Sequence, residues 1–234
     1  MNRTANVVRM QLINRNTFIW VPLLILAGSF ALTLAINGVI DSSVTDAAHQ
    51  PKYSGGAQAP LYYLAVVGVQ AMTLTFPFSQ ALSVTRREFY SGTLLTAAAA
   101  SAVLTLIYLI GGAIEDATHG WGFDSYFFHL PWIWSQGPVV AALLYFTAPF
   151  FFFVVGFLAA NIFKRFGLLW LVVVGLTILA AIVLAAFFIG RADAWASVGH
   201  WFATLKPLTV AAIGLGASAV FAGISYGILR RTIP

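Results

Sequence analysis

Six stretches of about 20 apolar residues each constrain the fold of this chain more than any other feature. They cover roughly residues 18–38, 60–82, 94–114, 138–160, 168–190 and 207–229. A helix of about 20 residues is long enough to cross the roughly 30 Å hydrocarbon layer of a bilayer. The stretches are apolar on every side, whereas the strands of a membrane barrel alternate in polarity. The sequence therefore predicts an all-α integral membrane protein with six transmembrane helices.

These spans use most of the chain, and only 8% of the 234 residues are charged. We expect residues 1–234 to form a single transmembrane domain without a nucleotide-binding domain. The sequence contains no G-x-x-x-x-G-K-[ST] pattern, which excludes a P-loop as its route to ATP binding.

The basic residues predict the orientation of the chain, because Lys and Arg concentrate in the cytoplasmic loops of membrane proteins. With a cytoplasmic N-terminus, the inner segments are 1–17, 83–93, 161–167 and 230–234. The outer loops hold only Lys52, Arg191 and Lys206, and the inner segments hold the other nine basic residues: Arg3, Arg9, Arg15, Arg86, Arg87, Lys164, Arg165, Arg230 and Arg231. We expect a multi-pass plasma-membrane protein with both termini in the cytoplasm. The net charge of +5 is spread over four short segments and does not predict nucleic-acid binding.

Patterns typical of catalysis or metal binding are missing from the sequence. The chain has no cysteine, and its four histidines fall in or beside the outer loops without a spacing such as H-x-x-x-H. The stretch GASAVFAG at 216–223 is similar to the serine motif of rhomboid proteases, but no histidine follows Ser218 to act as its base. We expect no catalytic residue, metal or cofactor on this chain.

Small residues form stripes on two of the predicted spans. One stripe is Ala27, Ala31, Ala35 and Gly38, and the other is Ala212, Gly216, Ala219, Gly223 and Gly227. Small residues at such spacing let helix backbones approach closely within a membrane. The stripes predict either packing within the chain or a seam between two copies.

Polar residues form a stripe on the second span: Gln70, Thr73, Pro77 and Gln80. Because polar groups are costly in hydrocarbon, this face is expected to form internal hydrogen bonds or to line a substrate route. Pro77 is expected to free a carbonyl and to kink the helix. The acids of the outer side, Glu115 among them, are placed outside the spans, which argues against a carrier driven by protons or sodium.

Both long outer segments are rich in aromatic residues. Residues 119–136 contain Trp121, Phe123, Tyr126, Trp132 and Trp134, and residues 191–206 contain Trp195 and Trp201. Such side chains favour the headgroup layer of a bilayer. The alternatives are an aromatic belt at the membrane surface and a contact with an amphipathic cargo. Either segment is a candidate for an interfacial or re-entrant helix.

The densest charge cluster of the chain lies between the second and third spans, in SVTRREFYSG at 83–92. Topology explains Arg86 and Arg87, but it explains Phe89 and Tyr90 less well. Charge combined with aromatic rings is typical of residues that anchor a protein–protein contact. The segment is therefore either a solvated cytoplasmic loop or a docking element for a cytoplasmic partner.

The stretch ALSVTRREFYSGTLL at 81–95 resembles the loop between spans two and three of bacterial type-2 ABC export permeases, which often reads S/T-R-R-x-F/Y-x-x-G-x-L. Six spans, internal termini, a basic N-terminal segment and the LRR at 229–231 are also similar to that family. The resemblance covers the whole chain by architecture and about 15 residues by motif.

This resemblance implies a type V exporter-like permease in which the loop is a coupling helix that inserts into a separate ATPase subunit. That position is occupied here by Arg86, Arg87, Glu88, Phe89 and Tyr90. ATP and Mg would be bound by the partner. The permease would pair with itself or with a sibling, and its N-terminal segment would be a connecting helix along the inner surface.

In the same family, spans two and five commonly flank the transport route. The route candidates here are therefore Gln70, Thr73, Gln80 and, on the fifth span, Thr177. The abundance of Phe and Trp favours a hydrophobic or amphipathic cargo, such as a drug, a peptide or a lipid. Membrane lipid is also an expected partner of the chain. The alternatives are a non-transporting binding, sensory or self-immunity subunit against membrane-active peptides, and a structural membrane protein without an ATPase.

Overall fold

The computed structural model describes residues 7–11, 16–43 and 51–230, and it confirms an all-α architecture for these residues. Six helices among them are long and apolar enough to cross a membrane: Asn16–Ser43, Gly56–Ala81, Arg86–Ala117, Pro138–Phe166, Leu168–Arg191 and Pro207–Leu229. Each coincides with one predicted span. The predictions for Arg3, Arg15 and Arg231, and for the side chain of Phe123, lie outside what the structure describes.

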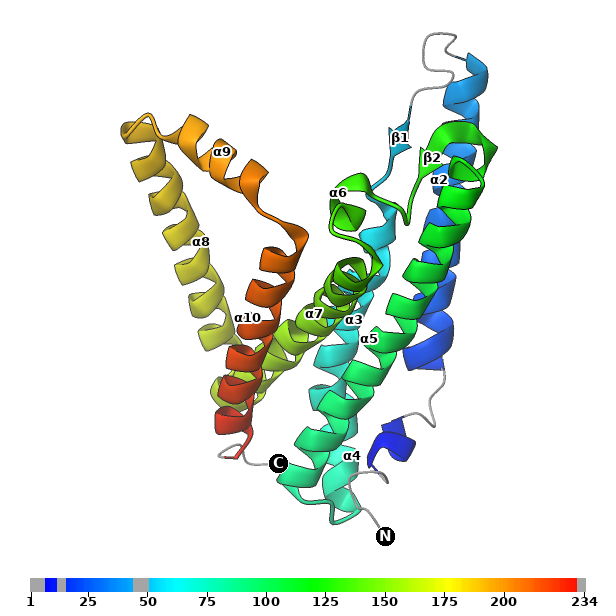
Figure 1. The fold of residues 1–234 in the computed structure, drawn as a ribbon. Helices are drawn as coiled ribbons and strands as arrows, with labels where there is room; N and C mark the ends of the chain where they lie inside the picture. Colours follow the sequence, from blue (N-terminus) through cyan, green and yellow to red (C-terminus); the bar gives the residue numbers. More distant parts are fainter. Residues whose placement is uncertain (1–6, 12–15, 44–50, 231–234) are drawn as a thin grey trace.

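The first two spans are built from several consecutive segments, and the third is a single long helix (Figure 1). The first combines η1 (Asn16–Trp20) with α2 (Val21–Ser43). The second runs through η2 (Gly56–Gln58), α3 (Ala59–Gln70), η3 (Ala71–Thr75) and α4 (Phe76–Ala81). The third is α5 (Arg86–Ala117), and residues 7–11 form a further helical turn near α4 (Figure 1).

The last three spans are α7 (Pro138–Phe166), α8 (Leu168–Arg191) and α10 (Pro207–Leu229). Short elements connect the spans: η4 (Gly120–Asp124) and α6 (Pro131–Trp134) before α7, and α9 (Trp195–Thr204) between α8 and α10. Proline occupies the first or second position of α3, α7 and α10. It suits these positions because an amide there has no partner within the helix.

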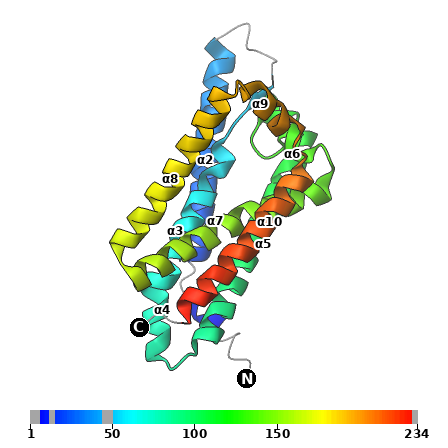
Figure 2. The same cartoon turned by 90° about the vertical axis from the view of Figure 1, so that its left-hand side faces the viewer.

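Two ends of the helix bundle can be distinguished (Figures 1 and 2). We call the end with residues 82–85 the inner end and the opposite end the outer end, after the predicted orientation. The 7–11 turn, the Gly167 junction between α7 and α8, and the last turn of α10 also lie at the inner end. This placement agrees with six alternating crossings.

Helix α7 is the centre of the bundle, because it packs against α3, α5 and α10. The closest approach is made by Gly68 of α3 and Gly156 of α7. A Cβ atom at Gly156 would collide with the backbone of Ala65, and one at Gly68 would collide with the backbone of Phe153. Glycine is therefore needed at both positions for α3 and α7 to be in backbone contact.

The core lies between α3, α4, α5 and α7. Its largest fully buried side chains include Phe76, Phe89, Phe153 and Phe157. The rings of Phe76 on α4 and Phe89 on α5 meet edge to face with their centroids 5.1 Å apart. Such pairs add to the packing energy beyond the area that they bury.

Helices α8 and α9 lie at the periphery. None of the residues of α8, all of which are described, is buried. Figure 1 shows α8 leaning away from α10, and both views show α9 joining their outer ends (Figures 1 and 2). The 191–206 segment thus contains a helix of ten residues.

The outer end also contains a short parallel pairing that the sequence did not predict. Strand β1 (Lys52–Tyr53) pairs with β2 (Ser125–Tyr126). Lys52 is 2.7 Å from a carboxylate oxygen of Asp41, and Asn37 donates a 2.7 Å hydrogen bond to Ser125. These contacts fasten the 120–130 segment to the outer end of α2.

Packing within the chain does not use the two predicted small-residue stripes. Ala212, Gly216, Ala219, Gly223 and Gly227 are all exposed, as are Ala27, Ala31 and Ala35, and Gly38 is partly exposed. No side chain lies within 4 Å of a Cβ built at Gly38, Gly216, Gly223 or Gly227 among the described residues. The close contact uses Gly68 and Gly156 instead, because these glycines face α7 and α3 respectively.

Candidate functional site

The segment between the second and third spans is shorter than predicted, because α5 begins at Arg86. Thr85 caps this helix with a reciprocal pair of hydrogen bonds: its hydroxyl accepts from the Glu88 amide at 3.3 Å, and the Glu88 carboxylate accepts from the Thr85 amide at 3.0 Å. This capping box satisfies two amides at the start of the helix. The predicted 83–93 loop is thus a four-residue turn, 82–85, followed by the first turns of α5. We call residues 82–90 the inner elbow.

Three of the five predicted coupling residues are engaged within the chain. Phe89 is fully buried against Phe76. Arg86 donates to the backbone carbonyls of Leu229 at 3.3 Å and Arg230 at 3.0 Å. A cation at this place also stabilises the negative end of the α10 dipole.

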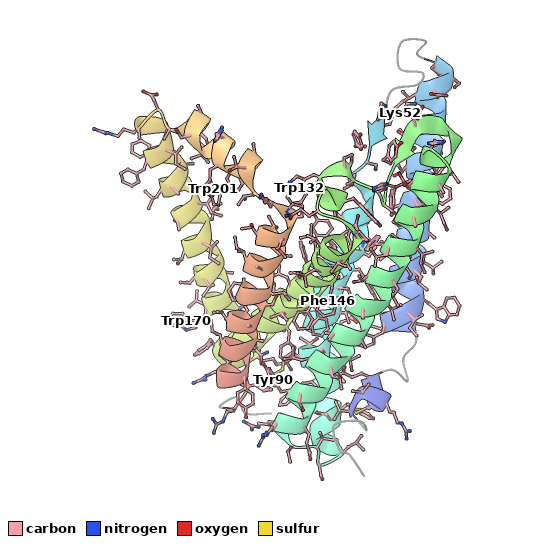
Figure 3. The ribbon with its side chains drawn as sticks, in the orientation of Figure 1. Lys52, Tyr90, Trp132, Phe146, Trp170 and Trp201 are labelled. Atoms are coloured by element: carbon pink, nitrogen blue, oxygen red, sulfur yellow. The ribbon has the colours of Figure 1, made fainter. Side chains whose placement is uncertain are left out.

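Tyr90 makes the third of these contacts. Its hydroxyl donates a 2.8 Å hydrogen bond to the Ala222 carbonyl of α10, and its ring centroid is 4.9 Å from that of Tyr226. Figure 3 places Tyr90 between the lower ends of α5 and α10. The inner elbow is therefore joined to α4 through Phe89 and to α10 through Arg86 and Tyr90.

The remaining two coupling candidates lie toward solvent. Arg87 is exposed, and Glu88 is half-exposed while it caps the helix. Leu82 is also exposed, at 56% of its surface. The inner elbow thus presents a basic residue and an apolar residue outward while its aromatic residues hold it in place.

The predicted polar stripe of the second span does not stay on one face. The amide of Phe76 bonds to the carbonyl of Ala71, five residues earlier, so Ala71–Thr75 forms a π turn ahead of Pro77. A π turn adds one residue to the helical repeat and rotates everything after it. Pro77 lies in the first turn of α4, directly after this π turn, and the i, i+3, i+7, i+10 spacing no longer places the four stripe residues on one face.

The four stripe residues have different environments. Gln80 donates to the Val84 carbonyl at 3.1 Å and so braces the turn of the inner elbow. The Thr73 hydroxyl donates back to Val69 of its own helix, and Pro77 is exposed. Gln70 alone lines a hollow.

This hollow, about 220 Å³ in volume, lies between the 7–11 turn and the second span. Gln11, Thr17, Gln70 and Thr75 give it a partly polar wall. Gln11 reaches across to α5, where its amide donates to the Thr93 hydroxyl at 2.6 Å. The 7–11 turn is therefore tied to the inner half of the bundle.

Thr177 of α8 is exposed, and its hydroxyl donates to Val173 of its own helix. Among the described residues, Thr177 does not line the hollow that Gln70 lines. The part of the route predicted from the fifth span is therefore not assembled within this single chain.

The outer end contains a buried carboxylate, Glu115, that was expected in an outer loop. Helix α5 continues to Ala117, and Glu115 is fully buried in its last turn. Burial of a carboxylate is costly unless hydrogen bonds replace its water. The prediction that the acidic residues lie outside the spans is therefore wrong for Glu115, which lies within α5.

Each oxygen of Glu115 accepts two hydrogen bonds. Oε1 accepts from the Trp121 indole at 2.7 Å and from the Phe127 amide at 2.8 Å. Oε2 accepts from the amides of Phe128 at 2.7 Å and His129 at 2.6 Å. The carboxylate thus fixes the 121–129 segment over the end of α5.

The aromatic residues of the outer segments divide into anchors and exposed rings. Trp121 bonds to Glu115, the Trp134 indole donates to the Phe128 carbonyl at 3.4 Å, and the ring of Tyr126 is 5.6 Å from that of Tyr53. The Trp132 indole donates to the Leu205 carbonyl at 3.1 Å and so joins α6 to the connection between α9 and α10. The rings that are about half exposed include Trp132, Trp195, Trp201 and Phe202. Trp132 and Trp201 lie toward the outer end (Figure 3).

Among the described residues, no group of three or more His, Asp or Glu side chains is arranged to hold a metal ion. Ser218, the residue of the protease-like stretch, donates to the Gly214 carbonyl of its own helix at 2.7 Å. Three features could therefore serve a function: the inner elbow, the hollow lined by Gln11 and Gln70, and the outer end with its 121–129 segment fixed by Glu115.

Comparisons of the chain with protein-family models, with curated proteins and with solved structures found no match.

Proposed function

We propose that this chain is the membrane-spanning permease subunit of an ATP-driven exporter in a bacterial plasma membrane. A separate subunit would bind ATP and Mg and would dock at the inner elbow. Two permease chains, identical or sibling, would form the membrane part. The cargo would be a hydrophobic or amphipathic molecule.

The observation that carries this proposal is the way the inner elbow is attached. A docking element can transmit a movement only if it is connected rigidly to the helices that must move. Phe89 joins the elbow to α4, and Arg86 and Tyr90 join it to α10. A push on the elbow would therefore reach two spans at once.

The outward side of the elbow supports the same reading. Arg87 and Leu82 are both exposed at the inner end. An apolar contact combined with an arginine is common at the centre of protein interfaces. The proposal therefore assigns recognition to Arg87 and Leu82, and transmission to Arg86, Phe89 and Tyr90.

Two other observations agree with an export role. Both small-residue stripes are exposed, which leaves them available for contact between two chains. Gln70 lines a hollow at the inner half of the second span, where a cargo from the inner leaflet would enter. The cargo route would then be completed by the second chain.

Substrate-stimulated ATPase activity of the reconstituted complex tests the proposal. Arg87→Ala removes an exposed cation without touching the core, so ATPase stimulation should fall at least tenfold while insertion and helix content stay unchanged. Lys164→Ala is the matched control, since Lys164 is an exposed cation at the same end outside the elbow. It should leave stimulation within about twofold of the unsubstituted protein, as exposed charges elsewhere contribute little.

Equal stimulation in the Arg87→Ala and Lys164→Ala complexes would contradict the docking role of the elbow. Purification of the chain without any ATPase, from cells expressing its complete operon, would contradict the exporter itself. That second result would favour the alternative of a membrane subunit that binds or sequesters a membrane-active peptide.

A further inference from the structure

An apolar cavity of about 290 Å³ lies within the outer half of the chain. Its walls come from four separate parts: the start of the second span, α5, the 127–133 segment and α7. The residues lining it are Ala57, Gln58, Leu61, Tyr108, Phe127, Leu130, Ile133, Leu144, Tyr145, Ala148, Pro149 and Phe152. None of these lining residues is charged.

Two of the polar groups of the wall are already engaged. The Tyr108 hydroxyl donates to the Ala57 carbonyl at 2.7 Å, and the Tyr145 hydroxyl donates to the Phe128 carbonyl. These two donors are therefore unavailable to a ligand, and the third polar side chain of the wall is the uncharged amide of the exposed Gln58. A charged ligand would find no charged partner in this wall. The cavity selects an uncharged and largely apolar group.

Its size and its rings narrow the ligand further. A dry apolar cavity of roughly 150 Å³ is enough to hold benzene, so about twice that volume fits two fused rings or an acyl segment of similar size. Tyr108, Phe127, Tyr145 and Phe152 all line it. Aromatic walls make favourable edge-to-face contacts with a ring.

We call the 127–133 segment the roof of the cavity. The hydrogen bonds to Glu115 fix the start of this segment. The carboxylate accepts hydrogen bonds from the amides of Phe127, which lines the cavity, and of the next residue, Phe128. Gly111 leaves room for the ring of Phe128, since a Cβ there would be 2.7 Å from it. A roof tied by its backbone cannot collapse easily onto α7, so the site is largely pre-formed.

The other apolar hollows lack this construction. One lies between the first span and α5, around Phe18, Pro22 and Val103. Another lies on the outside of α5 and α7, around Leu106, Val139 and Leu208. Both are lined by span residues alone, so lipid would cover them without any special site.

We propose that the outer cavity is a binding site for a single uncharged apolar group, either a ring system of about ten carbon atoms or an acyl segment of the same size. The group belongs either to a free small molecule or to a lipid chain. Binding uses only this chain, so the site does not depend on an ATPase and goes beyond the proposed transport function.

Photolabelling of the purified protein in nanodiscs tests the site, with 1-azidonaphthalene as the probe and mass spectrometry as the readout. Labelling of the peptides containing Tyr108 and Phe127 should saturate and should fall at least tenfold when naphthalene competes. Labelling of α8 should rise linearly with probe and resist competition, since α8 has no buried residue and reports lipid partitioning.

Ala148→Phe fills the cavity and should abolish the saturable labelling, and Ala148→Leu should weaken it. Ala142→Phe is the matched control, because Ala142 lies on the same helix but lines the lipid-facing hollow. If Ala148→Phe fails to fold, the smaller Ala148→Leu and the naphthalene competition still decide. Linear, non-competed labelling of Tyr108 and Phe127, unchanged in both Ala148 variants, would overturn the proposal.

A second arm identifies the source of the apolar group. Nanodiscs containing a phosphatidylcholine with a photoactivatable acyl chain should label Tyr108 and Phe127 if a lipid chain occupies the site. Labelling by 1-azidonaphthalene alone assigns the site to free small molecules. Absence of labelling by both probes would refute the site.

Discussion

At the scale of single residues, Glu115 shows what the sequence could not predict. A glutamate followed by an aspartate at the end of an apolar stretch is typical of a solvated helix end, and the four donors that bury it come from residues 121 to 129. Three of these donors are backbone amides, which carry no residue-type signal. The arginines of the inner elbow, by contrast, could be found from their sequence alone, although the inward direction of Arg86 could not.

Glu115→Gln should destabilise the outer end strongly. The amide keeps one acceptor oxygen and turns an NH₂ group toward two donors, so at least two bonds to a charged acceptor are lost. The free energy of unfolding should fall by about 3 kcal/mol or more, because bonds to charged groups contribute roughly 1.5–3 kcal/mol each. Unfolding by a denaturing detergent, followed by tryptophan emission, measures the change.

Asp116→Asn is the matched control for this prediction. Asp116 is the next residue in α5, and its side chain is 71% exposed beside His129. Its replacement should change the free energy of unfolding by less than about 1 kcal/mol, as is usual for exposed charges. Equal effects of the Glu115 and Asp116 variants would contradict the role given to the buried carboxylate.

At the scale of elements, the positions of the helices were predictable and their contacts were not. Apolar length and the prolines at 60, 138 and 207 located the spans to within a few residues at most ends. The start of α5 was misplaced by eight residues, because the capping box at Thr85 and Glu88 lies ahead of the apolar stretch. The small-residue stripes were expected to mark contacts within the chain or between two copies. The close contact within the chain is instead made by Gly68 of α3 and Gly156 of α7, which belong to neither stripe.

Gly156→Val should separate α3 from α7. A side chain at Gly156 meets the backbone of Ala65, which cannot move aside as a flexible side chain would. The free energy of unfolding should fall by about 3 kcal/mol or more, at or above the upper range for overpacked sites. The same detergent unfolding measurement applies.

Gly223→Ala on α10 provides the comparison, since nothing lies within 4 Å of a Cβ built there among the described residues. Alanine should leave the stability of the single chain unchanged or raise it by up to about 1 kcal/mol, because it loses less backbone freedom on folding than glycine. A destabilisation by Gly223→Ala as large as that by Gly156→Val would contradict the assigned packing.

At the scale of the whole molecule, the number of spans followed from composition, whereas the arrangement of α8 and α9 did not. Helix α8 is apolar on all sides and makes its contacts mainly with α7 at the Gly167 junction. A helix that is apolar all round gives no preferred face, so its sequence cannot say which neighbour it chooses. Among the described residues, α8 therefore does not bring Thr177 beside Gln70, the route residue predicted on the second span.

The orientation predicted from the basic residues can be tested directly, because the chain has no cysteine. Lys164→Cys at the inner end and Ser197→Cys on α9 each introduce a single thiol at an exposed position. In intact cells, a membrane-impermeant maleimide should label the Ser197→Cys variant and spare the Lys164→Cys variant. The reverse pattern would show that the inner end faces outward.

Site-specific crosslinking at the inner elbow tests the central claim most directly. Ser91 is exposed one turn beyond Arg87, and Ser91→Cys provides a single thiol that leaves the docking and anchoring residues intact. With a short bifunctional reagent in inverted membrane vesicles, the Ser91→Cys variant should crosslink to an ATPase subunit encoded in the same operon, and the Ser197→Cys variant should not. A Ser91→Cys variant that is labelled from outside the cell, or that forms no crosslink in the assembled complex, would contradict the account.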